Sequence, residues 1–401
     1  MNEQLVVKNF GPIKDATVDF KRVTVFIGPT GGGKSTLAKL AAIFRDASLY
    51  LSGQKGFGRY LSNYYIKSFE SDSSTLHWHS NLMSARLLEG KLATGATEIV
   101  AQKMVIMRQQ LDAAAMEMKA LRELLDASPV GIGKEEEAKG KIAELFRVKK
   151  EATEFYKRTI APNKPHYIPA ERLLLSVLGT SWPDLIREGA NLPDVLLEFA
   201  KQYLLAREEV KLMELHLFNI VYKNEANRDL IILDSGKSVF LSETASGIQS
   251  VTPLLVLLEH LSRNTEQAQS FIIEEPELNL YPTAQQGLLN WLVEKCTKGE
   301  NDLTITTHSP YILSHLNLML YAYQVAEKHP DQKAAIAAIV PEASWINPKE
   351  FACYQVEGGG VHSLVDTELG LIDNNALDNI SGDKADAFDQ LININRGFAH
   401  A

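Results

Sequence analysis

The hydrophobic positions along the chain predict an α/β domain with buried strands. Continuous apolar runs bounded by polar residues are typical of strands covered on both faces. Three such runs occupy 22–27, 270–274 and 303–307. A helical pattern follows the first run at 36–44, two strands flank a Gly-Pro turn within 4–20, and β-hairpins are expected at 230–241 and 351–365. This alternation of strands and helices indicates the α/β class.

The hydrophobic period changes between 97 and 160. Apolar residues there are spaced alternately three and four positions apart, which is the seam of a heptad repeat. A Ser-Pro-Val-Gly-Ile-Gly stretch at 128–133 interrupts the repeat, and a second helical stretch runs from 135 to about 156. We expect an antiparallel helical hairpin with arms of roughly 40 Å. The alternative is two helices packed on the body. The seam comprises Met104, Met107, Leu111, Ala114, Met118, Leu121 and Leu125.

The sequence predicts the structure of the remaining stretches in less detail. The segment 182–219 is expected to be largely helical, and a helix is expected at 251–261. The segment 45–93 combines aromatic and basic residues, which suit nucleobase stacking, but a half-buried sheet edge with surface lysines is the favoured interpretation. From 365 onward the chain is acidic, which indicates a solvated face or, alternatively, a docking surface for a basic partner.

Composition limits the class of protein. The 401 residues are 45% hydrophobic and 23% charged, enough for a large core or two lobes. The net charge of −9 argues against a surface covered by positive charge. Cys296 and Cys353 provide neither a disulfide framework nor metal-ligand spacing. With no signal-like N-terminus and no apolar run of membrane length, we expect a cytoplasmic protein without a membrane partner.

A phosphate-binding loop joins the first buried run to the first helix. The stretch FIGPTGGGKSTL at 26–37 fits G-x-x-x-x-G-K-[ST]. Its glycines let backbone N–H groups point at phosphate oxygens, and the helix start adds its positive dipole end. Lys34 is expected to reach the β- and γ-phosphates, and the Ser35 hydroxyl to ligate magnesium. The predicted ATP-binding residues are Gly28, Pro29, Thr30, Gly31, Gly32, Gly33, Lys34, Ser35 and Thr36.

Two later strands end in residues that suit the other half of a nucleotide site. The run SFIIEEPE at 270–277 ends in carboxylates, where a magnesium-holding acid is expected opposite the phosphate loop. Glu274 is predicted to support Mg²⁺, directly or through water, and Glu275 to polarise the attacking water. The run at 303–307 delivers His308 to the carboxyl end of its strand, where α/β sheets bind ligands. His308 is therefore predicted to contact the γ-phosphate.

A third stretch, Ser246-Gly247-Ile-Gln249, precedes the helix at 251–261. A helix start with small residues can bind an anion. Ser-Gly before a helix is also a common cap, so this signal is weak on its own.

Together these motifs resemble the ABC-type ATPases of the RecF, SMC and OLD-like group. GPTGGGKST is similar to the group's phosphate loop, IIEEPELNLYP to its acidic motif and TTHSPYIL to its histidine switch. SGIQ looks like the signature motif, and NFGPI and YIPAER also look like this group. The motifs are spread over 1–315 in the family's order.

The resemblance implies a fold and a mechanism. The fold would be an ABC-type P-loop nucleotide-binding domain of two lobes with an inserted antiparallel helical hairpin, a short coiled-coil arm. Two subunits would stack head to tail around ATP and Mg²⁺, each placing its signature stretch against the γ-phosphate held by the other's Lys34. The residues implied in these roles are Ser246, Gly247 and Gln249 in trans, Asn279 in the loop between subunits, and Glu275 and His308 in catalysis.

The chain departs from the family pattern in four respects. Thr30 stands where an asparagine is common, and Glu274 replaces the more usual aspartate. No glutamine loop is recognised. The 93 residues after His308 contain no Asp-x-Asp pair on a strand, so a fused nuclease domain of the OLD type is expected to be absent.

The predicted organisation has four parts. They are an N-terminal lobe with the phosphate loop at 1–96, the hairpin at 97–160, a lobe with the signature, acidic motif and histidine switch at 161–320, and an extension with an acidic terminal helix at 321–401.

The resemblance also implies a role. Stand-alone ATPases of this kind resemble components of bacterial anti-phage systems. The chain would then be an ATP-hydrolysing sensor, regulatory or scaffold subunit, a dimer or higher oligomer that controls a separately encoded effector. The alternative is a RecF-like DNA-repair ATPase. The net charge and the 12 basic against 11 acidic side chains of 97–160 make nucleic acid the less favoured partner.

Overall fold

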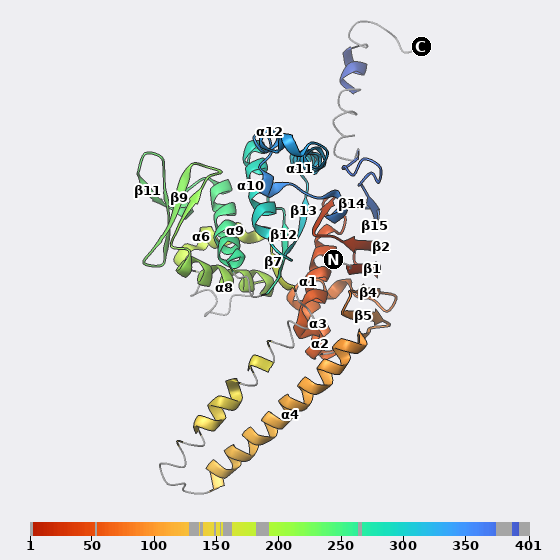
Figure 1. Cartoon of the computed structure of the whole chain (residues 1–401), viewed down its shortest axis with the longest axis vertical. Helices are drawn as coiled ribbons and strands as arrows, with labels where there is room; N and C mark the ends of the chain where they lie inside the picture. The colour runs from red at the N-terminus through yellow and green to blue at the C-terminus, as the bar shows by residue number, and fades with distance from the viewer. Residues whose placement is uncertain are drawn as a thin grey trace.

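A computed structural model describes residues 3–52, 54–127, 136, 139–147, 150–152, 154, 163–181, 192–263, 267–373 and 387–392. Three β-sheets and the helices around them form two hydrophobic cores, and a long helical arm leaves the body at one end (Figure 1). The predicted α/β fold, a P-loop domain with an inserted helical hairpin, is confirmed.

The central sheet has six strands in the order β15-β14-β3-β13-β12-β7. All neighbours are parallel except β15, which pairs antiparallel with β14. In this register Thr307 lies opposite Ile27, and Glu274 lies opposite Thr306. The carboxyl ends of β3, β13 and β12 therefore meet at one edge of the sheet. The strands are β3 (Val23–Ile27), β7 (Lys164–Ile168), β12 (Gln269–Glu274), β13 (Asp302–Thr307), β14 (Phe351–Glu357) and β15 (Gly360–Ser363).

The two cores lie on opposite faces of this sheet. Successive side chains of a strand point to opposite faces, and in β3 Val25 joins one core while Phe26 joins the other. In β12, Ile272 and Ile273 are divided in the same way. Every residue of both strands is buried. This explains why their sequences are continuous apolar runs rather than alternating ones.

One core is closed by α1, by two short helices and by an antiparallel sheet of order β2-β1-β4-β5-β6. The α1 sequence KSTLAKLAAIFR is rich in strong helix formers, and ten of its twelve residues are buried. The elements are β1 (Glu3–Phe10), β2 (Ile13–Phe20), α1 (Lys34–Arg45), α2 (Ala47–Ser52), α3 (Gln54–Asn63), β4 (Thr75–His79), β5 (Met83–Leu88) and β6 (Lys91–Ala96).

The other core is closed by helices and by an antiparallel sheet of order β11-β10-β9-β8. The helices are α6 (Leu173–Leu178), α8 (Asp194–Glu209), α9 (Ser246–Ser262), α10 (Pro282–Cys296), α11 (Pro310–Lys328) and α12 (Lys333–Ala337). The strands are β8 (Leu212–Leu215), β9 (Ile220–Glu225), β10 (Arg228–Ile232) and β11 (Ser238–Phe240). Single 3₁₀ turns are η1 (Lys67–Phe69), η2 (Ala170–Arg172), η3 (Gly179–Ser181), η4 (Leu241–Glu243), η5 (Pro330–Gln332), η6 (Glu342–Ser344) and η7 (Pro348–Glu350).

Two sequence expectations need correction. The expected sheet edge at 45–93 is helical over α2 and α3 and becomes sheet only from β4 onward. The expected helix at 182–219 covers α8, but the chain then turns into β8, and 182–191 lies outside the described residues. In both cases aromatic and apolar residues pack equally well on a helix or a strand, so composition does not decide between them.

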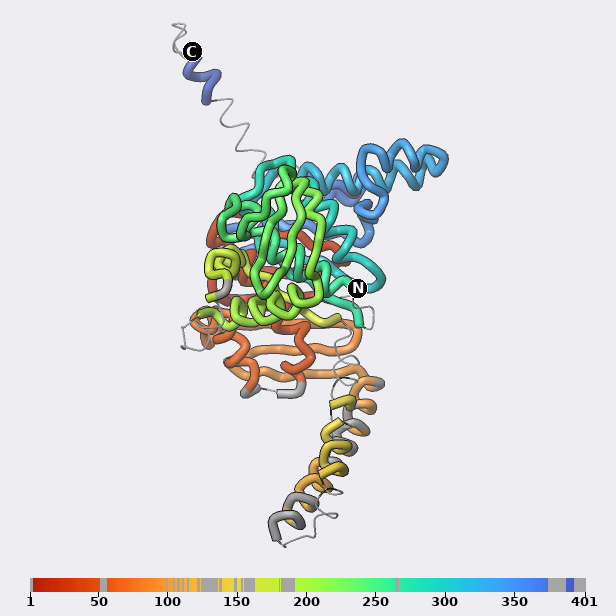
Figure 2. Tube along the Cα trace, turned by 90° about the vertical axis from the view of Figure 1, so that its left-hand side faces the viewer, coloured from red at the N-terminus to blue at the C-terminus, as the bar shows by residue number. Residues whose placement is uncertain are grey.

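The helical arm follows β6. Its first helix, α4 (Glu98–Ala127), projects from the end of the molecule that carries β5 and α3, and the returning segment runs beside it in both views (Figure 1; Figure 2). An ion pair of 3.1 Å joins Lys141 of the returning segment to Glu117. Met118, a seam residue, is buried although its neighbours on α4 are exposed. The turn expected at 128–133 and the side chains of the other seam residues lie outside the described residues.

The acidic terminal helix is described only at 387–392, which is helical, and the rest of that prediction falls outside the described residues. Within the part of the chain that the structure describes, no helix has the length and apolarity needed to cross a bilayer.

The strand β7 forms one edge of the central sheet. It pairs with β12 alone, and the other long side of the strand has no neighbouring strand among the described residues. Its second residue is Pro165, which has no backbone N–H to offer along that edge.

The hairpin expected at 351–365 forms as β14 and β15, and it joins the central sheet. β14 pairs parallel with β3, so its end lies against the phosphate loop. A Cβ atom at Gly28, where φ is +140°, would lie 2.2 Å from the Val356 carbonyl oxygen. The glycine at this position therefore serves the packing of β14 as well as the shape of the loop.

We expect Gly28→Ala to lower the free energy of unfolding by about 2–4 kcal/mol, because overpacking and a strained φ act together. Gly31→Ala is the matched control, since Gly31 also has a positive φ but a Cβ atom there would meet no neighbouring segment within 4 Å. It should cost only about 1 kcal/mol. Urea titration of both variants measures the difference, and equal losses would contradict the packing argument.

Candidate nucleotide-binding site

The phosphate loop connects the carboxyl end of β3 to the start of α1. The Lys34 ammonium lies inside the curve of the loop and donates hydrogen bonds to the carbonyl oxygens of Gly28 at 2.8 Å and Pro29 at 3.0 Å. No side chain caps the N-terminus of α1, so its first N–H groups suit an anion. Exposure varies around the loop: Pro29, Thr30 and Gly31 are exposed, Gly32 and Ser35 are half-buried, and Gly28, Gly33, Lys34 and Thr36 are buried.

Three carboxylates lie close enough to Lys34 to affect its ionisation. Burial lowers the pKa of the Lys34 ammonium, and the negative charges of Glu275, Glu274 and Glu277 oppose that shift. Glu274 is the last residue of β12, and Glu275 and Glu277 lie in the turn that follows. The sheet register thus brings the acidic stretch and the lysine of the phosphate loop together, as the sequence predicted.

Glu274 is the last residue of β12 and is almost completely buried. Burial raises the pKa of its carboxyl, and the hydroxyls of Tyr167 and Ser35 oppose that shift. Its Oε1 atom is buried without a hydrogen-bond partner among the described residues. A buried carboxylate oxygen beside the Ser35 hydroxyl fits a Mg²⁺ ion, which takes one or two protein oxygens together with nucleotide phosphates.

Glu275 occupies the turn after β12 with a left-handed backbone, at φ +41°. Its N–H donates to the Thr306 carbonyl at 3.0 Å, which anchors the turn to β13. Its side chain is about one-third exposed, and Oε1 lies 3.2 Å from His308 Nε2. A non-glycine residue in this backbone region is strained, which is common where a side chain must point in one direction. The two predicted catalytic residues therefore form a pair.

Glu277 is a site residue that the sequence analysis left without a role. Its Oε1 accepts hydrogen bonds from the Thr307 hydroxyl at 2.5 Å and from the His308 N–H at 3.0 Å. Burial raises the pKa of its carboxyl, and these hydrogen bonds oppose the shift. Glu277 thus holds the backbone that carries His308. Its place three residues after Glu274, across a proline, was the available signal.

The signature stretch lies at the start of α9. Ser246 is exposed, and Gly247 is packed so closely that a Cβ atom there would lie 2.7 Å from the Asn279 carbonyl oxygen. Asn279 is itself exposed, with φ +65°. The Gln249 amide donates to the carbonyls of Ser242 and Thr244, so it shapes the preceding turn. The structure thus brings Gly247 and the Asn279 loop together on one surface.

Arg172, the last residue of the YIPAER stretch, is the second residue that sequence reasoning missed. It is fully buried, and its guanidinium contacts the backbone of the turn that carries Glu275. Its signal was a charged residue four positions after the end of β7 and directly before the apolar run LLL.

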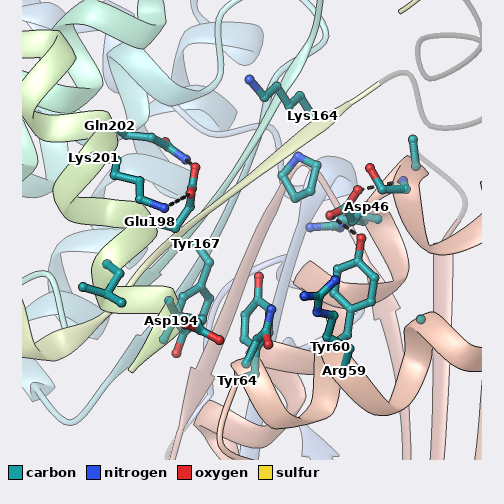
Figure 3. A pocket seen from close by; sticks show the side chains of 18 of the residues that line it. Asp46, Arg59, Tyr60, Tyr64, Lys164, Tyr167, Asp194, Glu198, Lys201 and Gln202 are labelled. Carbon is teal, nitrogen blue, oxygen red and sulfur yellow. Dashed lines mark hydrogen bonds and ion pairs between the residues drawn. The ribbon is translucent and has the colours of Figure 1, made fainter. Parts of the chain in front are cut away.

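A large cleft of the described structure lies elsewhere. It has a volume of about 970 Å³ and opens between α3, β7 and α8, and no residue of the phosphate loop lines it (Figure 3). Tyr64 and Tyr167 meet at its centre, with ring centroids 5.2 Å apart. Its charged walls carry both signs, from Arg59, Lys164 and Lys201 and from Asp46, Asp194 and Glu198. Tyr167 lines this cleft and also lies near Glu274. The cleft therefore adjoins the carboxylate that is predicted to bind magnesium.

We expect Glu274→Gln to raise the free energy of unfolding at neutral pH in the absence of Mg²⁺. Burial raises the folded-state pKa of Glu274 above 4.5, so ionising it weakens the fold as the pH rises from 4.5 through that folded pKa. The gain should vanish below pH 4.5, where the group is protonated in both states. Urea titrations at pH 7 and pH 4 test this, with the exposed Glu300→Gln variant as the control. An equal gain in unfolding free energy at both pH values would contradict the prediction.

Comparison with known proteins supports the nucleotide-binding assignment. Residues 135–313 match the family model of an AAA ATPase domain, a segment that contains the acidic turn and His308 but begins after the phosphate loop. No curated protein matches the chain.

Solved structures give distant likenesses. They include the SMC head domain from Thermotoga maritima, with a TM-score of 0.37 and 13% identity over 90% of this chain and 98% of that chain. A Smc head domain with coiled coil and joint from Pyrococcus yayanosii gives 0.36 and 9%, over 92% and 97%. The recombination mediator protein RecF gives 0.32 and 10%, over 90% and 98%. At these TM-scores the likenesses carry no argument about activity or partners.

The family match and the P-loop geometry agree with the resemblance in the sequence. Residues 135–313 of the chain are therefore similar to an AAA ATPase domain.

Proposed function

We propose that the protein binds ATP with Mg²⁺ and hydrolyses it between two subunits arranged head to tail. The observation that carries the proposal is the pair formed by Glu275 and His308 at the same sheet edge as Lys34. A carboxylate there can accept a proton from an attacking water, while a histidine beside it contacts the γ-phosphate.

Each residue then has a defined task. Lys34 and the N-terminus of α1 bind the β- and γ-phosphates, and Ser35 with Glu274 holds the metal, which neutralises charge on the transferred phosphoryl group. Glu275 orients and deprotonates water. Glu277 keeps His308 in place through its backbone N–H.

The head-to-tail arrangement is supported by the surface around Ser246. No side chain caps the N-terminus of α9, and Ser246 and Asn279 are both exposed beside Gly247. The first N–H groups of α9 therefore suit a phosphate presented by a second copy. In this arrangement ATP joins the subunits and hydrolysis releases them.

We expect Glu275→Gln to lower kcat about 100- to 1,000-fold, because the general base is lost. ATP binding should survive, so the variant should accumulate as an ATP-dependent dimer. Steady-state ATPase assays and solution mass with and without ATP measure both effects, with exposed Glu300→Gln as the matched control. Wild-type turnover in Glu275→Gln would refute the proposal. So would a solution mass that does not change with ATP in either the wild type or Glu275→Gln.

The wider role we propose is control of a separately encoded effector in bacterial anti-phage defence. Its support is the sequence resemblance to stand-alone ATPases of such systems. The subunit interface would translate nucleotide state into a signal for the effector, and the protein would act in the cytoplasm.

This role predicts that Lys34→Ala abolishes phage protection in a host that carries the chain with its neighbouring genes, because nucleotide binding is lost. Plaque counts for wild type, Lys34→Ala and the control Lys298→Ala, an exposed residue, test it. Equal plaque counts with and without the wild-type genes would refute the defence role and leave the ATPase proposal standing.

A further inference from the structure

Arg172 uses every hydrogen-bond donor it has on backbone oxygens. A guanidinium carries five N–H groups, and five bonds of 2.6–3.3 Å are formed inside a fully buried site. The acceptors are the carbonyls of Glu274, Glu275 and Pro276 in the turn after β12, of Ser250 in α9, and of Pro169 just before η2.

The three consecutive acceptors surround the strained residue. Arg172 Nη1 binds the Glu274 carbonyl at 2.8 Å, and Nη2 binds those of Glu275 at 2.6 Å and Pro276 at 3.1 Å. The N–H of Glu275 is held from the other side by β13. Both peptide groups of the left-handed residue are therefore fixed, and with them the direction of its side chain. A lysine ammonium lacks the planar fork needed to reach all three oxygens.

A charged side chain is unusual at a fully buried position whose contacts are all with backbone carbonyls. Burial lowers its pKa to about 10, and the negative charges of Glu277, Glu275, Glu274 and Glu171 oppose that shift. No carboxylate forms a direct ion pair with it among the described residues. An apolar side chain would avoid this cost of desolvation but could donate no hydrogen bonds to the backbone carbonyls. The position therefore requires the forked geometry of a guanidinium.

The segment that contains Arg172 and Ser176 also forms hydrogen bonds to the start of α9. Arg172 Nε donates to the Ser250 carbonyl at 3.2 Å, and the Ser176 hydroxyl donates to the Gln249 carbonyl at 2.7 Å. These acceptors lie within about one turn of Ser246. A shift of the α9 N-terminus therefore moves the oxygen that Arg172 holds, together with the guanidinium that holds Glu275.

We propose that Arg172 is a positioning residue that couples the N-terminus of α9 to the conformation of Glu275. The inference rests on the proposed function, in which α9 meets the γ-phosphate of a second copy. Engagement of α9 then sets the Glu275 carboxylate for catalysis, so hydrolysis follows assembly. Arg172 itself contacts neither nucleotide nor metal in this scheme.

The test compares Arg172→Lys and Arg172→Met with the matched control Arg207→Lys. Arg207, near the end of α8, is another buried arginine, and it pairs with Asp229 of β10 at 3.2 Å. We expect both Arg172 variants to lose about 100-fold or more in kcat, since a small misplacement of a catalytic group has that effect. Their affinity for ATP, measured with a fluorescent analogue, should stay within about threefold of wild type, because the phosphate loop is untouched. Arg207→Lys should lower the melting temperature and leave kcat unchanged.

The outcomes separate the two proposals. Wild-type kcat in Arg172→Lys overturns the coupling role, as does a loss of kcat and ATP affinity by the same factor. If both Arg172 variants fail to fold, Ser176→Ala decides, since it removes only the second link to α9: a severalfold lower kcat at an unchanged melting temperature supports coupling, and a wild-type kcat overturns it. A wild-type protein that hydrolyses no ATP refutes the proposed function, and the coupling falls with it.

Discussion

The parallel register of β3, β13 and β12 is the constraint on which the rest of the molecule depends. It places Ile27 beside Thr307 and Thr306 beside Glu274, so that the phosphate loop, the acidic turn and the histidine begin at one edge. A slip of one residue would turn every buried side chain of a strand to the opposite core. Because β3 and β12 contribute to both cores, such a slip is excluded by packing on each face.

The same edge concentrates features that oppose stability. Lys34, Glu274 and Glu277 are buried with pKa values shifted toward their neutral forms, and Glu275 has a strained backbone. Natural proteins tolerate local conflicts of this kind mainly where function needs them. A nucleotide with its metal would supply the missing countercharges, so ligand binding and the relief of these conflicts belong to one process.

Much of this arrangement was predictable because its signals are local. The phosphate loop, the strands that carry Glu275 and His308, and the periodicity of the arm each lie within a short window of sequence. The roles of Glu277 and Arg172 depend instead on contacts between distant segments, as does the entry of β14 beside β3. No periodicity or spacing reveals which strand a hairpin will join. Even Gln249, which the resemblance placed across the subunit interface, is bonded to its own turn, a detail that only packing defines.

Pro165 on the edge strand β7 limits how copies of this chain can associate. An added strand needs an unbroken row of N–H and C=O groups, and a proline removes a donor from that row. The opposite edge is the short β15, of four residues. Neither margin of the central sheet offers a good template for growth into a continuous intermolecular sheet. A contact between two copies at this sheet would therefore have to use helix ends, loops and side-chain faces rather than strand pairing.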